Sequence, residues 1–173
     1  METLFTDGIT ANTAFSKIKI SYENAMYNEI NQQAENDPYI DWGAGLNVLL
    51  ISDSALGRAL GLFLYISTKT SFKGVKFCMD IDQIEEYLNS TIPDIIIYVG
   101  IQDKIENYHA IPMAQRKNRQ VMVAMFDFLD DVIESECINY RIRYAFSSNK
   151  RIRDGLLYLK QAFEDNKKTF KTE

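Results

Sequence analysis

The sequence predicts an α/β domain in which five parallel strands form one sheet with helices on both faces. Two observations support this prediction. From Leu46 onward, short apolar runs alternate with segments of helical length, which is typical of parallel strands joined by crossover helices. The runs themselves, such as Val48–Ile51, contain almost no polar residue, as expected for strands that are buried on both sides.

The order of the predicted elements follows from the chain. Val48–Ile51 is the first strand, and Ser54 is a suitable N-cap for a helix over Ala55–Ser67. The remaining strands are predicted at Val75–Met79, Asp94–Val99, Gln120–Met125 and Ile142–Phe146. The helices between them are predicted at Asp82–Asn89, with Asp82 as its cap, at Ile105–Lys117 and at Phe128–Glu136.

Two of the helices carry further signals. Pro112 interrupts Ile105–Lys117, so a kink or a late start is expected there. The last helix begins near Ser148, and one apolar stripe marks its buried face: Ile152, Leu156, Leu159 and Phe163.

Residues 1–45 precede this alternating pattern and are predicted to form a separate N-terminal extension. Apolar residues recur in it at helical intervals: Phe15, Ile18, Tyr22, Ala25 or Met26, and Ile30. The segments Asn36–Pro38 and Gly43–Gly45 then break the helix and form a linker. The helix could pack on its own domain, pair with a second copy or another partner, or be disordered. The expected division is therefore an extension over 1–45, a domain over 46–166 and a tail over 167–173.

Composition excludes several classes of function. The chain has 173 residues, 46% of them hydrophobic, and a net charge of −5, all of which falls within the first 45 residues. No net basic region marks a nucleic-acid interface, and no apolar run is long enough to cross a membrane. The chain opens with acidic Met1-Glu2, unlike a signal peptide. Cys78 and Cys137 have no metal-site spacing, so a reduced cytoplasmic protein is expected.

Two segments carry a resemblance to a known family. Asn47–Ser54 (NVLLISDS) and Pro93–Gly100 (PDIIIYVG) resemble the receiver domain of bacterial two-component response regulators. The resemblance spans roughly Leu46 to Asn166 and implies the CheY-like, flavodoxin-like doubly wound strand order. In that family the third strand reads Pro-Asp, four apolar residues and Asp, and this last Asp accepts a phosphoryl group. Here Val99 stands at the acceptor position.

The resemblance also implies where the other phosphorylation groups should lie, and most are missing. The acidic pair after the first strand becomes Ser52-Asp53, the hydroxyl residue that ends the fourth strand becomes Met125, and the lysine after the fifth strand becomes Ser147. Asp53 alone supplies too few oxygens to hold Mg²⁺. Four other acids follow strands and are expected to cap helices instead: Asp80, Asp82, Asp103 and Asp127. No catalytic residue, metal or cofactor is therefore expected, and His109, the only histidine, is expected at the surface or in helix packing.

Charge is unevenly distributed over the fourth helix, fifth strand and fifth helix, the face through which receivers commonly signal or dimerise. Acids lie on the first part of this region and bases on the second: Asp127, Asp130, Asp131, Glu134 and Glu136, then Arg141, Arg143, Lys150, Arg151 and Arg153. A two-fold axis would bring the acids of one copy onto the bases of the other. The alternatives are pairing within one molecule, simple solvation, or a different protein partner. Tyr144 or Phe146 is the counterpart of the aromatic switch residue on the fifth strand.

The leading hypothesis is a receiver-like interaction module that is active without phosphorylation and is not an enzyme. Its expected partners are proteins, including a second copy through the charged face or the N-terminal helix, and not nucleic acid or membranes. The alternative is a flavodoxin-like protein that binds a nucleotide or another small ligand in the crevice of the sheet. Its polar contacts would come from the loops Ser52–Ser54, Gly100–Asp103 and Ser147–Asn149.

Overall fold

A computed structural model of the chain describes residue 25, residues 27–54 and residues 57–171. Within them, five strands form one parallel sheet in the order β2-β1-β3-β4-β5. The strands are β1 (Asn47–Ile51), β2 (Gly74–Cys78), β3 (Ile95–Val99), β4 (Met122–Asp127) and β5 (Tyr144–Ser147). This order is that of flavodoxin-like and CheY-like domains, so the predicted fold class is confirmed.

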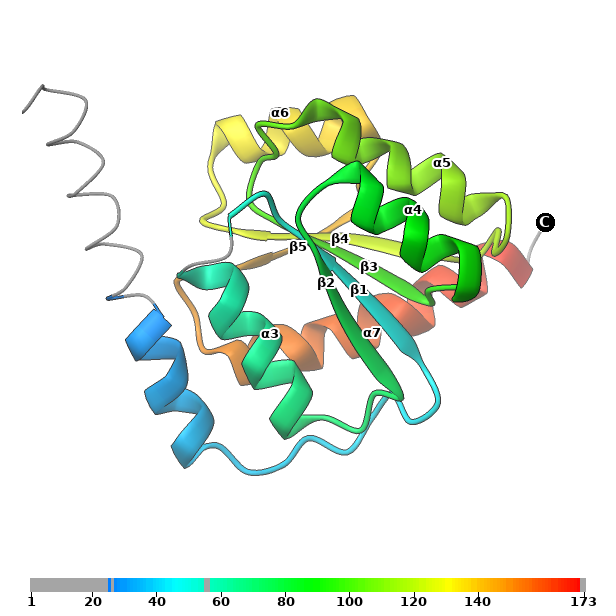
Figure 1. The fold of residues 1–173 in the computed structure, drawn as a ribbon. Helices are drawn as coiled ribbons and strands as arrows, with labels where there is room; N and C mark the ends of the chain where they lie inside the picture. Colours follow the sequence, from blue (N-terminus) through cyan, green and yellow to red (C-terminus); the bar gives the residue numbers. More distant parts are fainter. Residues whose placement is uncertain (1–24, 26, 55–56, 172–173) are drawn as a thin grey trace, which may run out of the picture.

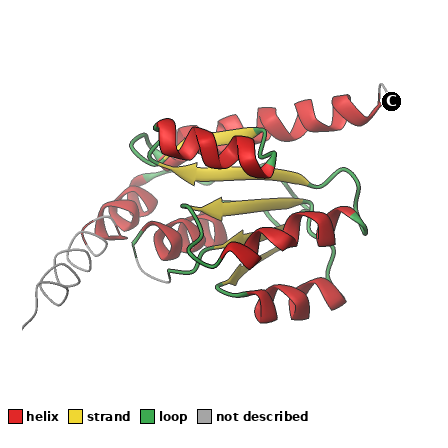
Figure 2. Cartoon of the chain, turned by 90° about the horizontal axis from the view of Figure 1, so that it is seen from above, coloured by secondary structure: helices red, strands yellow, loops and turns green. Residues whose placement is uncertain are grey.

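Helices cover both faces of the sheet (Figure 1). The described helical elements are α3 (Arg58–Lys69), α4 (Ile81–Ser90), the 3₁₀ helix η1 (Ile105–His109), α5 (Ala110–Gln115), α6 (Asp131–Tyr140) and α7 (Ile152–Lys171). Helices α3 and α7 lie on one face, and α4, α5 and α6 lie on the other, which Figure 2 shows from above. None of these described helices combines the length and the apolar character that a membrane crossing requires.

The core consists of two clusters, one on each face of the sheet. Side chains alternate between the faces along each strand, so neighbouring residues enter different clusters. Val99 and Phe126 belong to the cluster under α3 and α7, whereas Tyr98 and Met125 belong to the cluster under α4, α5 and α6. The central strand β3 is buried along its whole length, as its apolar sequence predicts.

Four predicted helix caps are wrong. Asp103 does not cap η1, whose N-cap is Lys104 without a side-chain bond, and Asp127 stays in β4; the other two are Ser54 and Asp82. Helix α3 begins at Arg58 with Gly57 as its N-cap, not at Ser54, whose backbone N–H donates to Ser52 Oγ. Gly57 has φ 65°, a left-handed conformation that glycine adopts without a steric penalty. Helix α4 is capped by Asp80 rather than Asp82, because Asp80 Oδ1 accepts the hydrogen bond from the backbone N–H of Gln83.

Other boundaries shift by a few residues. The predicted helix over 105–117 is a 3₁₀ turn followed by the short helix α5, and Pro112 lies in the first turn of α5, where no intrahelical N–H bond is lost. Helix α6 begins three residues later than predicted, because Asp130 caps it by accepting the N–H of Ile133. Strand β5 begins at Tyr144 rather than Ile142, and α7 begins at Ile152 and continues to Lys171.

The described part of the N-terminal extension packs on its own chain. Residues 27–36 are helical, and Ile30 is 5% exposed. Ile30 lies so close to α3 that a Cβ on Gly61 would stand 3.0 Å from Ile30 Cδ1. Small side chains permit such close approaches of two helices, which explains why glycine occupies this position. The other residues of the predicted apolar face, Phe15, Ile18, Tyr22 and Met26, lie outside the described residues, and Ala25 is exposed.

The segment predicted as a linker is held by a buried carboxylate. Asp37 is 4% exposed and accepts a hydrogen bond of 2.7 Å from Tyr65 Oη of α3. Its second oxygen lies 2.5 Å from Nη2 of Arg151, just before α7. Beyond it, Trp42 packs edge-on against Phe72, with ring centroids 5.0 Å apart. Residues 37–42 therefore tie α3 to the start of α7.

We expect Asp37→Ala to lower the free energy of unfolding by about 1–3 kcal/mol, because it leaves the buried hydroxyl of Tyr65 without its acceptor. Glu35→Ala removes the same charge from an exposed side chain and serves as the control. Chemical denaturation of both variants and the wild type measures the difference.

The effect of Asp37 depends on pH. Burial by itself raises the pKa of Asp37, but hydrogen bonds from Tyr65 and Arg151, together with the charges of Arg151 and Arg153, outweigh it and lower the pKa overall. A lowered folded-state pKa gives stability that is present above the unfolded-state pKa and is lost as pH falls through the folded value. The gap between the wild type and Asp37→Ala should therefore shrink in acid. A gap that widens there would contradict this role.

Candidate functional site: the crevice at the carboxyl ends of the strands and the α6–β5–α7 face

The position where the resemblance to receivers predicts the phosphoryl acceptor, the end of β3, is occupied by a valine. Val99, the last residue of β3, is 5% exposed and packs in the same cluster as Phe126 and Phe146. In the parallel register Val99 lies beside Phe126 of β4. A valine side chain has no group that can attack phosphorus, so this position cannot be phosphorylated. Met125, the counterpart of the hydroxyl residue, is fully buried on the other face of the sheet.

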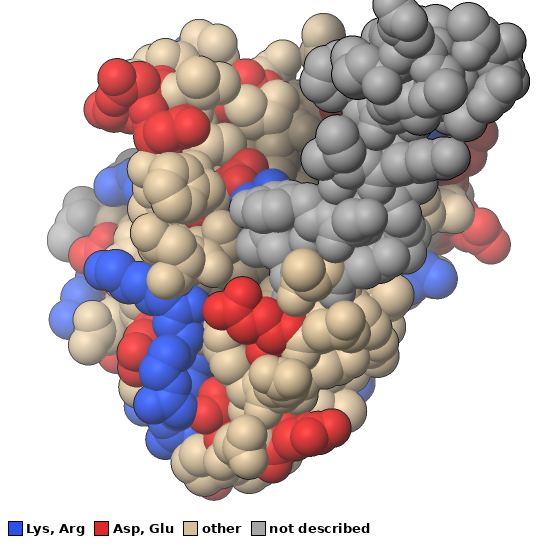
Figure 3. Space-filling view, turned by 90° about the vertical axis from the view of Figure 1, so that its left-hand side faces the viewer, with Lys and Arg blue, Asp and Glu red and all other residues tan. Residues whose placement is uncertain are grey.

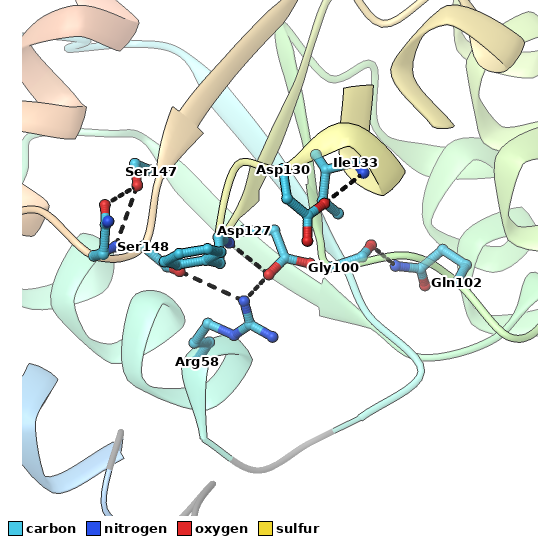
Figure 4. A network of polar contacts seen from close by, with 10 residues as sticks. Arg58, Gly100, Gln102, Asp127, Asp130, Ile133, Ser147 and Ser148 are labelled. Carbon is cyan, nitrogen blue, oxygen red and sulfur yellow. Dashed lines mark hydrogen bonds and ion pairs between the residues drawn. The ribbon is translucent and has the colours of Figure 1, made fainter. Parts of the chain in front are cut away.

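An acid does lie at this edge of the sheet, and it is paired with an arginine. Asp127 ends β4, and its Oδ1 forms an ion pair with Nη1 of Arg58 at the start of α3 (Figure 4). The two side chains are only 13% and 28% exposed, respectively. Nη1 of Arg58 also donates to Ser148 Oγ at 3.5 Å, and Asp127 Oδ1 accepts the backbone N–H of Phe128 at 2.6 Å.

Sequence reasoning missed the role of Asp127 in the crevice. Asp127 was expected to cap a helix, but Asp130 caps α6, and Asp127 remains in the strand. Because glycine follows β3, little side-chain volume separates Asp127 from the end of that strand: a Cβ on Gly100 would lie 3.4 Å from Asp127 Oδ2. Its position directly after the apolar run Val121–Phe126 was the available signal. The pairing with Arg58 had no sequence signal, since the two residues are 69 positions apart.

The remaining polar groups at this edge bond to one another. Ser52, 3% exposed, accepts the N–H of Ser54, and Asp53 accepts the backbone N–H of Lys104 at 2.9 Å. Gln102 donates to the carbonyl of Gly100 at 2.8 Å. Ser147 donates to the side-chain oxygen of Asn149 and accepts its backbone N–H. These bonds fix the three loops that border the crevice.

The arrangement offers little to a divalent cation. Within the described ranges, no three His, Cys, Asp or Glu side chains are grouped closely enough to hold a metal ion. The guanidinium of Arg58 instead supplies positive charge next to the carboxylate of Asp127. A bound cation would have to displace that guanidinium and still find several oxygen ligands.

The aromatic counterpart of the receiver switch is held by packing. Phe146 is 4% exposed, and its ring lies 4.8 Å from that of Phe126. A Cβ on Gly155 of α7 would stand 2.7 Å from Phe146 Cδ2, so the ring fills the space that glycine leaves. Tyr144, the other candidate, donates its hydroxyl to Asp165 at 2.9 Å.

An exposed apolar surface lies over α6, β5 and α7, which we call the α6–β5–α7 face. The exposed apolar side chains that line the grooves of this face are Leu129, Ile138 and Tyr158. Two grooves border β5: one of about 560 Å³ between α6 and β5, and one of about 300 Å³ between β5 and α7. Leu129 and Ala145 line both grooves, so the surface is continuous across the edge strand.

The structure divides the charged residues predicted for this face. Asp127 is buried against Arg58, Arg151 binds Asp37, and Arg153 donates to the carbonyl of Pro38 at 3.1 Å. Asp130 caps α6. The predicted charges that stay exposed and for which no bond is described are Asp131, Glu134, Arg141, Arg143 and Lys150. Figure 3, which looks onto the left side of Figure 1, shows acidic and basic side chains on that side of the molecule, including a band of basic ones.

Comparison with known proteins supports the fold alone. No family model and no curated protein matches the chain. Among solved structures, the chain is similar to the signal receiver domain of an HD domain-containing protein from Pseudomonas fluorescens Pf-5, at 16% identity and a TM-score of 0.58, covering 79% of this chain and 98% of that one.

Two further structures agree. The N-terminal signal receiver domain of a response regulator from Bacteroides fragilis is 15% identical, with a TM-score of 0.54, over 69% of this chain and 97% of that one. A CheY-like receiver domain protein from Methanospirillum hungatei JF-1 is 11% identical, with a TM-score of 0.52, over 73% and 99%. The chain thus has the fold of response regulator receiver domains.

We expect Arg58 and Asp127 to be energetically coupled. Arg58→Ala should lower the free energy of unfolding by about 1–3 kcal/mol, because it leaves a mostly buried carboxylate without its cation. In a double-mutant cycle with Asp127→Asn, the double variant should be more stable than the sum of the single effects predicts, by about 0.5–3 kcal/mol. Additive effects would show that the ion pair contributes nothing.

Proposed function

We propose that this chain is a receiver-like module that works without phosphorylation, has no enzymatic activity and acts by binding protein in bacterial signal transduction or regulation. The observation that carries the proposal is the filled crevice: Val99 replaces the acceptor, and Arg58 neutralises the nearby carboxylate of Asp127. The receiver fold supports the signalling context. A cytoplasmic location is part of the proposal.

Binding through the α6–β5–α7 face is the second part of the proposal. Large apolar patches on a soluble protein mark sites of protein interaction. Ile138 on α6 is 70% exposed, Leu129 before α6 is 44% exposed, and Tyr158 on α7 is 40% exposed. A partner that covers them would remove this apolar surface from water.

The partner that fits this face best is a second copy of the chain. Acidic Asp131 and Glu134 lie at the start of α6, and basic Arg143 and Lys150 lie at the two ends of β5. A two-fold axis across β5 brings acids of one copy toward bases of the other, an isologous arrangement. Exposed ion pairs contribute little affinity but select the orientation. The described N-terminal helix is a weaker candidate for dimerisation, because its Ile30 is already buried against α3.

We favour protein binding over the binding of a small ligand at the carboxyl-end crevice. The polar groups that would contact a nucleotide there bond instead within their own loops: Ser52 with Ser54, Gln102 with Gly100, and Ser147 with Asn149. A ligand would have to break these bonds before it could use the same atoms.

We expect the purified full chain to dimerise with rising concentration in sedimentation equilibrium. Ile138→Asp and Tyr158→Asp should each weaken dimerisation about tenfold or more, because each puts a charge in place of a largely apolar side chain that dimerisation would bury. Acetyl phosphate with Mg²⁺ should leave the dimerisation constant of the wild type unchanged.

The matched control is Ile105→Asp. Ile105 is 61% exposed but lies at the start of η1, away from the α6–β5–α7 face. It should leave dimerisation unaffected. A wild-type chain that stays monomeric at hundreds of micromolar would rule out the second copy as partner. Dimerisation that requires acetyl phosphate would overturn the phosphorylation-independent reading.

A further inference from the structure

A cavity lies at the opposite end of the sheet from the crevice. It measures about 430 Å³, within the range of small-molecule sites. Its walls come from α5, the carboxyl ends of α6 and α7, and the strands β4 and β5 near their amino ends, with Tyr140, Tyr144 and Phe170 among the lining residues. Figure 1 shows this end on the right, where α7 ends beside the start of β4.

Basic side chains line the cavity, and acidic side chains do not. Arg141, Arg143 and His109 line it, and no Asp or Glu does, although acids outnumber bases 24 to 19 in the chain. Two carboxylates interact with tyrosines that line the cavity: Asp165 accepts the hydrogen bond of the Tyr144 hydroxyl, and Glu136 interacts with the hydroxyl of Tyr108. The local charge is therefore opposite to that of the whole molecule.

The loops around the cavity extend this positive charge. Residues 107–126 and 141–153 contain no acid, and the two loops that precede β4 and β5 contribute four arginines, which we call the basic edge: Arg116, Arg119, Arg141 and Arg143. The end of α7 touches the first of these loops, because Asn166 Nδ2 donates to Gln120 O at 2.8 Å and Arg119 lies 5.7 Å from the ring of Phe170. The helix carboxyl ends contribute only about half a negative charge each.

Two of these arginines are held in place. Arg141 caps α6 in a left-handed conformation, φ 57° and ψ 40°, and its backbone N–H bonds to Ile138 O at 3.3 Å. The guanidinium of Arg143 lies 5.9 Å from the centre of the Tyr144 ring. Fixed backbone and ring contacts limit the entropy that a ligand would cost on binding.

The walls also present flat aromatic surface. Tyr140 stacks on Tyr108 with ring centroids 3.8 Å apart and an interplanar angle of 12°. Tyr144 and Phe170 line the same cavity. Planar rings and arginines together suit a ligand that joins an aromatic body to an anionic group.

We propose that this cavity binds a small phosphorylated aromatic compound, of which a mononucleotide is the simplest example. The phosphate lies at the basic edge against Arg141 and Arg143, and the base packs against the aromatic wall. The cavity and the crevice lie at opposite ends of the strands, whereas Arg141 and Arg143 line both this cavity and the α6–β5 groove of the proposed dimer face.

The test uses the full chain and AMP, followed by calorimetry and amide NMR. We expect saturable binding that moves the signals of residues 139–144 and leaves those of Ser52 and Asp53 in place. Adenosine and inorganic phosphate alone should bind at least tenfold more weakly than AMP, since each offers only one half of the ligand. Added salt should weaken AMP binding.

Arg143→Gln should weaken AMP binding at least tenfold, and Arg141→Asn should do the same, because asparagine tolerates the left-handed conformation of that cap. The control is Lys76→Gln, which removes one exposed positive charge on β2, at the far edge of the sheet. The proposal would be overturned if AMP did not bind at millimolar concentration, or if its binding survived in Arg143→Gln. It would also be overturned if AMP moved the NMR signals of the crevice, or if the chain bound single-stranded RNA but not AMP.

Discussion

The ion pair between Arg58 and Asp127 determines what the crevice of this domain can do. A parallel sheet places the last residues of its strands at one edge, and in receivers that edge collects acids around a cation. Here a guanidinium from α3, that of Arg58, neutralises Asp127, and Asp53 accepts the backbone N–H of Lys104. Val99 and Phe126 are buried near the ends of β3 and β4, so the core extends to this edge of the sheet.

The sequence predicts the fold well because the fold depends on a repeated pattern. All five strands and the helices between them follow from alternating apolar runs, and errors concentrate at helix starts. Ser54 and Asp82 are reasonable caps by residue type, but Gly57 and Asp80 take those positions because backbone geometry decides among neighbouring candidates. The N-cap propensity of a residue type cannot decide between two nearby residues that both favour the N-cap position.

The site is less predictable, because its contacts join distant parts of the chain. The sequence correctly predicts that Val99 is the last residue of a buried strand. The partners of Asp127 and Arg151 cannot be predicted from the sequence, because Arg58 and Asp37 lie 69 and 114 positions away from them. Two charges expected on an interaction face are therefore used inside the domain. What remains at the surface is apolar along α6 and α7, and basic at the opposite end of the sheet.

A magnesium titration followed by amide NMR tests the central claim most directly. We predict that adding Mg²⁺, and then beryllofluoride, leaves the signals of Ile51–Asp53, Val99, Gly100 and Asp127 in place, because Arg58 already neutralises Asp127 and Asp53 is bonded to the backbone of Lys104. Saturable shifts of these signals would show a cation site at the carboxyl ends of the strands and would contradict the account.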